Sequence, residues 1–347
     1  MTDGMVRQDD NYRIFTAPRT GTFAQRLDFL HASIGTFLKE EKARGRQLLY
    51  SKVFLSDAAN QETALQSSAL MQEHLQRAVC TTIQQPPADG SKIAVLMKTG
   101  VAEGRFMLHT LRLTDEEADN RDSYAQTVML FNKYIEAARS QGIELKTHCV
   151  RTWLYVRDID ANYDGVVRAR NDIFRQHGLS ADTHFIASTG IGGRTAGRKV
   201  LVAMDFLTYP DIKEEQKVYL QALDHLNPTH EYGVAFERAT RIDFPSGRQQ
   251  FLVSGTASID ARGHVVHAGD VRMQTLRLLQ NIGALLRNGG GTMDDIRYFV
   301  VYLRDMADAS DVESVLNEQY PGKPHIVTLA EVCRPQWLVE MECVALK

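Results

Sequence analysis

Apolar residues recur at helical spacing and then at strand spacing three times along the 347-residue chain. Each copy predicts an amphipathic helix that ends at a glycine, followed by a mostly apolar strand that closes on an aspartate. The copies run from a glutamine to an aspartate over the same distance within one residue, in the pairs Gln25 and Asp57, Gln126 and Asp158, and Gln274 and Asp305. This periodicity indicates an internal repeat.

A second helix is predicted soon after each aspartate, over residues Asn60–Ala78, Ala161–His177 and Ala309–Gln319. Each second helix is followed by two strand-like runs, which we interpret as a pair of neighbouring strands. Further hairpins are predicted around Arg105–Leu113 and Val234–Ser258, ahead of the second and third copies. The resulting βαβαββ order places the chain in the α+β class, with both helices of a copy on one face of its sheet.

A sheet with one bare face needs a covering layer, and three copies supply it by packing those faces around a pseudo-threefold axis. We therefore predict an intramolecular, trimer-like assembly that is a monomer. The boundaries are 1–100 for a degenerate first copy, 101–208 for the second, 209–230 for a linker and 231–347 for the third. The alternative is a set of unrelated α/β domains with similar helices.

Composition narrows the choice of partners. A net charge of -3 without a polybasic run argues against nucleic acid and against an anionic membrane surface. The chain shows neither an apolar run of spanning length nor a signal-peptide pattern at its start, so we expect a soluble, cytoplasmic protein. The four cysteines are widely spaced, and no zinc-binding or nucleotide-binding motif is present, so neither a metal nor a cofactor is expected.

Candidate chemistry gathers in the last two strand-like runs, over residues 327–347. Glu340 and Glu342 fall on one strand face beside apolar residues, and burial of a carboxylate raises its pKa towards the range of a general acid. A hairpin turning at Pro335 would bring Cys333 close to Glu340 on the neighbouring strand. The alternative is an edge hairpin with solvated glutamates and a buried thiol.

Comparison of equivalent positions in the three copies distinguishes structural residues from candidate catalytic residues. Superposing the last strands places Leu96 and Ala203 opposite Glu340, so only the third copy has an acid there. We interpret Glu340 as catalytic for this reason. Glu342 corresponds to Asp205 in the second copy, which favours a structural carboxylate paired with an arginine.

Two arginines of the second copy are candidates for binding an anionic ligand. On the strand before Asp158, Arg151 and Tyr155 share the face predicted to look towards the neighbouring copy. On the following helix, Arg170 falls in or beside the apolar stripe. It is either paired with a protein carboxylate such as Asp158 or Asp172, or placed for a carboxylate of a ligand.

The third copy resembles the YjgF/RidA superfamily through SGTASIDARGHVVHAGDVRMQTLRLLQNIGALL, VVYLRD and AEVCRPQWLVEMECVA. Members of that superfamily are homotrimers with active sites at subunit interfaces. The chain is more closely similar to the chorismatases, fused enzymes of the same kind, through RTWLYVRDIDANY, RARNDIF, ASTGIGG and SGTASI. The resemblance implies cleavage of chorismate, without a cofactor, in a pocket between the second and third copies.

The resemblance also implies roles for individual residues. Glu340 would protonate the enolpyruvyl methylene, and Cys333 is typical of the hydroxybenzoate producers, so 3-hydroxybenzoate and pyruvate are the expected products. Alternative products are 4-hydroxybenzoate and a dihydroxycyclohexadiene carboxylate. Arg238 matches an arginine of the related family. The two remaining loops, ASTGIGGR and SGTAS, offer hydroxyl groups to a ligand or are ordinary turns, and their candidate residues are Ser188, Thr189 and Thr256.

Two other classes remain open. The imine deaminases of the superfamily also use a glutamate of the last strand, but they bind the substrate carboxylate with an arginine seven residues ahead of the position of Arg334. Val327 stands at that position here, with His325 and Ile326 before it, which counts against deamination. A non-catalytic sensor built on the same scaffold is the third possibility, and the occurrence of Cys333 and Glu340 in one copy only argues against it.

Overall fold

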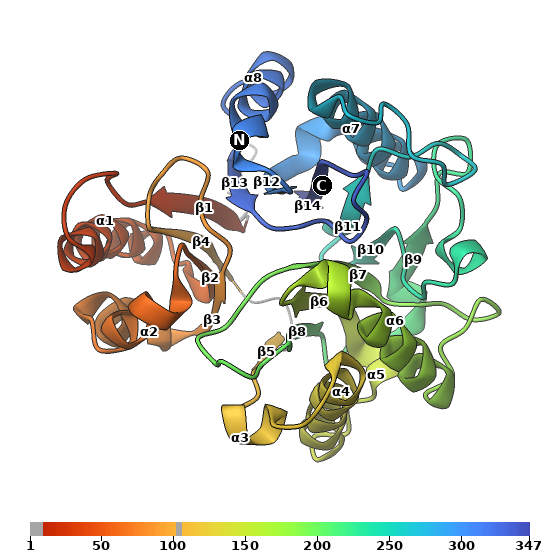
Figure 1. Ribbon diagram of the computed structural model, residues 1–347, viewed down its shortest axis with the longest axis horizontal. Coiled ribbons are helices and arrows are strands. Elements are labelled where there is room, and N and C mark those ends of the chain that lie inside the picture. Colours follow the sequence, from red (N-terminus) through yellow and green to blue (C-terminus); the bar gives the residue numbers. More distant parts are fainter. Residues whose placement is uncertain (1–9, 102–105) are drawn as a thin grey trace, which may run out of the picture.

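The computed structural model describes residues 10–101 and 106–347 and contains three sheets arranged around a common centre, with the main helices outside them (Figure 1). The first sheet has the order β1-β4-β2-β3, the second β5-β8-β6-β7 and the third β13-β12-β14-β11-β10-β9. The predicted α+β class and the tandem, pseudo-trimeric arrangement are thus confirmed.

The first unit combines its four strands with α1 and α2, and continues from α2 into a π-helical turn, η1, and a short 3-10 turn, η2. Its strands are β1 (Asn11–Thr16), β2 (Gln47–Leu55), β3 (Val79–Gln84) and β4 (Ile93–Gly100). Its helices and turns are α1 (Phe23–Ala43), α2 (Ala58–Gln66), η1 (Leu70–His74) and η2 (Leu75–Arg77). The predicted helix Asn60–Ala78 is therefore broken, because the Ser67 and Ser68 hydroxyls bond back to carbonyls of the preceding turn.

The second unit repeats this order with better-formed helices. Its strands are β5 (Met107–Leu111), β6 (Cys149–Val156), β7 (Ala187–Gly192) and β8 (Val202–Thr208). Its helices are α3 (Asp115–Ala118), α4 (Ser123–Arg139), α5 (Leu145–His148) and α6 (Ile159–Gln176). Of the hairpin predicted around Arg105–Leu113, Arg105 lies outside the described residues, and the described part forms the single strand β5.

The third unit adds two strands to the common pattern. Its strands are β9 (Lys217–Leu220), β10 (Ala239–Asp243), β11 (Gln249–Ala257), β12 (Ile296–Leu303), β13 (His325–Leu329) and β14 (Val339–Leu346). Its helices and turns are η3 (Glu214–Gln216), η4 (Thr229–Tyr232), α7 (Val271–Asn288), η5 (Met293–Asp295), η6 (Met306–Asp308) and α8 (Ala309–Gln319). The predicted β10–β11 hairpin forms, and β9 from the predicted linker extends its edge.

The strand pairs predicted after the second helices are wrong. In each unit the strand after the second helix pairs in parallel with the strand before that helix, as β13 does with β12. The final strand then lies in the middle of the sheet, so β14 pairs antiparallel with both β11 and β12. A strand, helix, strand connection favours this parallel crossover, which separates β13 from β14.

The repeated glutamines fix the start of the first helix in the second and third units. The Gln126 amide accepts a hydrogen bond from the backbone of Leu201, and the Gln274 amide accepts one from Leu338, both at the entry to the last strand. In the first unit Gln25 is exposed and completes a capping box with Thr22. The buried residue one position later is Arg26, so the repeat is offset there by one residue.

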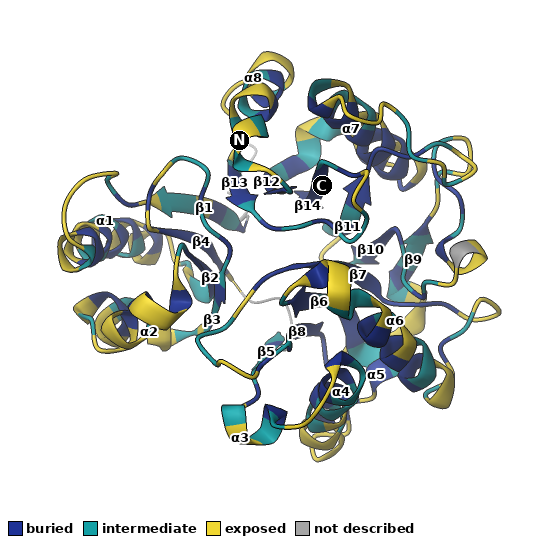
Figure 2. Ribbon diagram, viewed as in Figure 1, coloured by how far each residue is buried: buried dark blue, intermediate teal, exposed yellow. Residues whose placement is uncertain are grey.

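Burial follows the same plan, with the sheets mostly buried and the outward helix faces exposed (Figure 2). One large apolar cluster takes members from the inner faces of all three sheets, for example Phe54, Tyr155 and Tyr302. Among the described residues, none of the helices has both the length and the apolar character that crossing a membrane requires.

Candidate active site

A cavity of ≈ 410 Å³ opens between the second and third units, where the sequence predicted the pocket. Helix α6 and strand β7 form one wall, and β11, β14 and the segment between β13 and β14 form the other. Five of the predicted site residues line it, namely Glu340, Cys333, Arg170, Ser188 and Arg238. The volume suits a small organic ligand.

Glu340 extends from the middle of β14 into this cavity and is only 5% exposed. Its strand position is opposite Ala257 of β11 and Tyr302 of β12. Burial, followed by the nearby charge of Glu342, raises the pKa of Glu340 from 4.5 to about 8. The side chain is therefore a neutral acid at pH 7, able to donate a proton inside the cavity.

Glu342, two residues further on the same strand face, has the opposite character. Its carboxylate accepts hydrogen bonds from Arg151 at 2.8 Å, from the Thr189 hydroxyl at 2.6 Å and from the Trp153 indole. Burial alone would raise the pKa of Glu342, but Arg151 and Lys52 outweigh it and lower that pKa below its ordinary value. The two carboxylates thus divide into a protonated acid and a fixed anion, and the predicted pairing of Glu342 with an arginine is confirmed.

The backbone of β11 shapes the space around the acid. The register of β11 against β14 shifts between Val253 and Thr256, and Gly255 lies in this bulge. A Cβ atom on Gly255 would lie 1.9 Å from Oε1 of Glu340, so only glycine leaves room for the carboxyl group. The amide of Gly255 donates a hydrogen bond to the Thr189 hydroxyl at 2.9 Å, which connects the bulge to Glu342.

Cys333 lines the same cavity from the segment between β13 and β14. The hairpin predicted to carry it is wrong, because β12 lies between those two strands. Burial and the neighbouring Glu340 raise the pKa of the Cys333 thiol from 9.0 to about 12. The group is therefore a neutral thiol, since a nucleophilic cysteine needs a lowered pKa.

Arg170 supplies a positive charge with unused hydrogen-bond capacity. The residue is 1% exposed on α6, and its Nε and Nη2 atoms are buried without a hydrogen-bond partner among the described residues. The guanidinium lies 5.8 Å from the centre of the Phe236 ring and borders the cavity. Of the two sequence interpretations, the one with a ligand carboxylate explains these unused donors.

Two further arginines face the cavity. Arg238 is 7% exposed and donates to the backbone carbonyl and side-chain oxygen of Asn227. Arg334 lies over the Trp337 ring at 4.8 Å from its centre. With Glu340 neutral, Asp160 paired with Arg304 at 2.7 Å and Asp164 paired with Arg168 at 2.8 Å, the three arginines give the lining an excess of positive charge.

The other predicted site residues lie outside the cavity lining. Arg151 is 2% exposed and donates hydrogen bonds to the Glu342 carboxylate and the Ser254 hydroxyl. The Tyr155 hydroxyl donates to the carboxylate of Asp205. Thr189 holds Glu342, and the Thr256 hydroxyl donates to the carbonyl of Ser254.

Sequence reasoning missed Tyr163, Phe236, Arg334 and Trp337, all of which line the cavity. Tyr163 lies on α6, and a Cβ atom on Gly190 of β7 would lie 2.9 Å from the Tyr163 ring. The available sequence signal was therefore the glycine at position 190.

Comparisons with known proteins agree with this architecture. The family model described as Endoribonuclease L-PSP matches residues 245–347. The 3-aminoacrylate deaminase RutC of Acinetobacter baylyi is 34% identical over 95 residues, which are 27% of this chain and 75% of that protein.

Two solved structures are similar to all or part of this chain. A chorismatase crystal structure superposes with a TM-score of 0.66 at 19% identity, over 97% of this chain and 98% of that one. RidA from the Antarctic bacterium Psychrobacter covers 37% of this chain and 98% of its own, with a TM-score of 0.31 and 17% identity.

Proposed function

Because the chain belongs to the Endoribonuclease L-PSP family and has the fold of a chorismatase along nearly its whole length, we propose that it cleaves chorismate to 3-hydroxybenzoate and pyruvate. The observation that carries the proposal is a buried neutral acid, Glu340, in one cavity with a buried arginine, Arg170, that has unused donors. A substrate with two carboxylates and an acid-labile enol ether fits this combination.

In the proposed reaction, Glu340 transfers its proton to the methylene carbon of the enolpyruvyl group. The ether carbon becomes an oxocarbenium ion, and the neighbouring hydroxyl oxygen of the substrate captures it with loss of its proton. The bond from that hydroxyl oxygen to the ring then breaks, so pyruvate leaves with this oxygen as its ketone and the former ether oxygen stays on the ring. The ring carbon that bears the former ether oxygen loses its proton and the ring becomes aromatic; of the two protons released, one protonates the phenol oxygen and one returns to Glu340. Capture by water would instead leave both oxygens on the ring, as in the diene diol acid. Arg170, Arg238 and Arg334 supply the charge that fixes the two carboxylates, and such positioning adds to the roughly 10²–10⁴-fold of general acid catalysis.

Incubation with chorismate tests the proposal. Pyruvate is followed with lactate dehydrogenase and NADH, and the ring product is identified by chromatography against 3-hydroxybenzoate, 4-hydroxybenzoate and the diene diol acid. We expect stoichiometric pyruvate and 3-hydroxybenzoate. Absence of pyruvate release by the folded protein would remove the proposal.

Arg170→Met separates binding from chemistry. The apolar side chain is of similar length and leaves no buried charge, so the fold should persist. KM for chorismate should rise at least about tenfold, because one charged hydrogen bond of roughly 1.5–3 kcal/mol is lost. Arg175→Met is the matched control, because Arg175 is an exposed residue of the same helix whose ion-pair partner, Asp172, does not line the cavity, and it should leave KM unchanged.

Deamination is the second candidate, because the RutC relative is named as a 3-aminoacrylate deaminase. The position of the superfamily's carboxylate-binding arginine is Val327, a residue of β13 that is 4% exposed and does not line the cavity. An assay of ammonia release from freshly generated iminoacrylate tests this reading. We expect no acceleration over the uncatalysed rate.

A further inference from the structure

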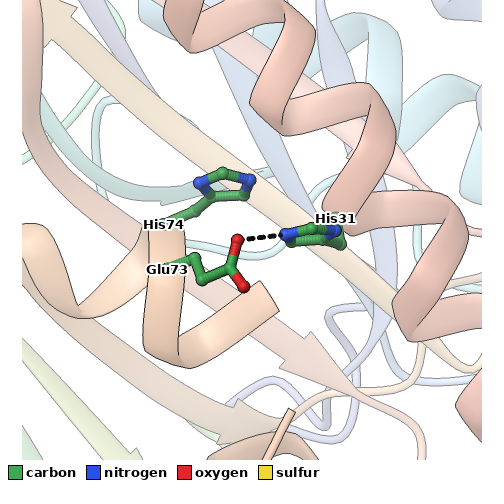
Figure 3. A group of neighbouring side chains, drawn as sticks. All are labelled: His31, Glu73 and His74. Atoms are coloured by element: carbon green, nitrogen blue, oxygen red, sulfur yellow. Dashed lines mark hydrogen bonds and ion pairs between the residues drawn. The ribbon is translucent and has the colours of Figure 1, made fainter. Parts of the chain in front are cut away.

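The first unit holds a cluster of His31, Glu73 and His74 that takes no part in the cavity (Figure 3). Nε2 of His31 and Oε2 of Glu73 are 2.9 Å apart, and the two imidazole rings stack with centres 4.6 Å apart. Within residues 10–101 and 106–347, this is the one group of three or more His, Cys, Asp or Glu side chains whose donor atoms all lie within 4.8 Å of one another.

Local structure brings these side chains together. His31 belongs to α1, whereas Glu73 and His74 are consecutive residues of the π-helical turn η1, and both are directed towards α1 (Figure 3). The chain reaches this turn because α2 ends early at Gln66. π-Helical turns of this kind are rare and are frequent at functional sites.

A glycine on α1 makes room for the second imidazole. A Cβ atom on Gly35, one turn after His31, would lie 2.8 Å from Nε2 of His74. Nδ1 of His74 is buried without a hydrogen-bond partner among the described residues. A buried imidazole nitrogen without a partner is uncommon and requires an explanation, which a ligand to that ring would provide.

We propose that His31, Glu73 and His74 bind a divalent transition-metal ion of the zinc type. Two imidazole nitrogens and one carboxylate oxygen form a ligand set that zinc accepts, with the fourth position left to water. Nitrogen ligands favour such ions over Mg²⁺ and Ca²⁺, which prefer oxygen. The donor atoms already lie within 4.8 Å of one another, and the stacked rings must turn on binding so that one nitrogen of each is directed at the ion at about 2.0–2.2 Å.

The ion would connect α1 to η1 and so stabilise the unit with the most irregular second helix. Sequence spacing could not reveal the site, because His31 and Glu73 are 42 residues apart and an adjacent Glu-His pair is common. The proposal is independent of chorismate cleavage, since the cavity lies between the other two units.

Titration calorimetry of the protein, dialysed against EDTA and then against buffer, tests the site with ZnCl₂ as the probe. We expect saturation at one ion per chain, a rise in the melting temperature with added zinc, and no heat with MgCl₂. Cobalt chloride should give the visible absorption of a four-coordinate Co²⁺ ion with nitrogen ligands.

His31→Ala and His74→Ala should each lower zinc affinity at least about tenfold, as the loss of a first ligand exceeds the 10–100-fold effect of outer partners. Should one of them fail to fold, Glu73→Gln removes a ligand at an exposed position and must weaken binding in the same way. His264→Ala is the matched control, because it removes an exposed histidine beside a single aspartate in the third unit. Absence of saturable zinc binding, or unchanged affinity in the folded ligand variants, would overturn the proposal.

Discussion

Two carboxylates two residues apart on one strand have opposite protonation states, and their neighbours explain the difference. Glu342 is surrounded by donors, among them Arg151 and Thr189, whereas Glu340 faces the cavity and has Glu342 as a negative neighbour. The negative charge that Arg151 fixes on Glu342 therefore helps to keep Glu340 protonated. In this pair Glu340 is the acid, and Glu342 is the anion that helps to raise the pKa of Glu340.

Glu340→Gln should retain the fold and lose turnover by at least about 10²-fold, because the amide matches the acid in size but has no proton to transfer. The rate of pyruvate release under saturating chorismate measures the effect, with circular dichroism as the control for folding. Wild-type turnover in this variant would exclude Glu340 as the acid.

The pH dependence follows from the raised pKa of Glu340, about 8 in the folded chain and 4.5 when unfolded. The acid form is required, so kcat/KM should fall as pH rises through about 8. The folded state also holds this proton more tightly than the unfolded state, so the contribution of Glu340 to stability is lost between about pH 4.5 and pH 8. A pH–rate profile with a plateau continuing to pH 10 would contradict the assignment.

Cys333 is expected to direct the product and not to form a covalent bond in each turnover, because its thiol stays neutral. Cys333→Ala should keep substantial pyruvate release and shift the ring product from 3-hydroxybenzoate towards the diene diol acid, because the smaller side chain admits water beside the ring. Chromatography of the products measures the ratio. Loss of pyruvate release as complete as in Glu340→Gln would show that the thiol takes part in the core chemistry.

At the scale of elements, the strands contain two kinds of register shift: one that all three units share and one that occurs only beside Glu340. A register shift near the start of β2, β6 and β12 is common to all three units. It lies between Leu48 and Tyr50, Cys149 and Arg151, and Ile296 and Tyr298. The shift at Gly255 in β11 has no counterpart in the registers of β1 or β5. It occurs in the one unit that has an acid at the position of Glu340, where the other two have Leu96 and Ala203, which connects this bulge to Glu340.

Gly255→Ala should therefore impair catalysis more than folding. The new methyl group would displace the Glu340 carboxyl from its place, and a misplacement of about 1 Å can cost roughly 10²-fold in rate. Gly283→Ala in α7 is the matched control, since its nearest neighbour is the flexible end of Arg287. Pyruvate release and melting temperature are measured for both. Full activity in Gly255→Ala would show that the bulge does not position the acid.

The sequence was sufficient for the elements that repeat and insufficient for what depends on strand order. Helix α8 has its predicted bounds, and Glu340, which was predicted because the other copies have apolar residues there, does line the cavity. The pairing of β13 and β14 was missed because periodicity gives the faces of a strand and not its neighbours. The same limit applies to Arg151, which was predicted to bind a ligand. The pattern gave the strand face of Arg151 and an arginine partner for Glu342, but not that the two residues are partners of each other.

At the scale of the whole molecule, corresponding positions on the three last strands carry buried charges with different partners. Lys98 pairs with Asp10, which also pairs with Arg248 of the third unit. Asp205 pairs with Arg112 and accepts from Thr81 of the first unit. Glu342 pairs with Arg151 of the second unit. Each interface between units thus has a buried charge with its own polar partner across the interface, namely Arg248 for Asp10, Thr81 for Asp205 and Arg151 for Glu342.

The edges of the sheets also join within the chain. The backbone amide of Ala88, beyond β3, donates to Val327 of β13, and that of Gly192 in β7 donates to Glu331 beyond β13. The amide of Gln84 in β3 donates to Arg194 beyond β7. These contacts link the three parallel edge strands to one another, and residues from the inner faces of all three sheets join one apolar cluster.

We therefore expect a monomer. Light scattering should give a mass near 39.0 kDa at all concentrations tested, because the inner faces of the three sheets already pack against one another inside one chain. Arg248→Met breaks the ion pair with Asp10 at the contact between the third and first units and should lower the melting temperature without changing the mass. Asp10 keeps Lys98 as its second partner, so the buried carboxylate loses only part of its compensating charge. A stable trimer of the complete chain would contradict the closure of the three units on one another.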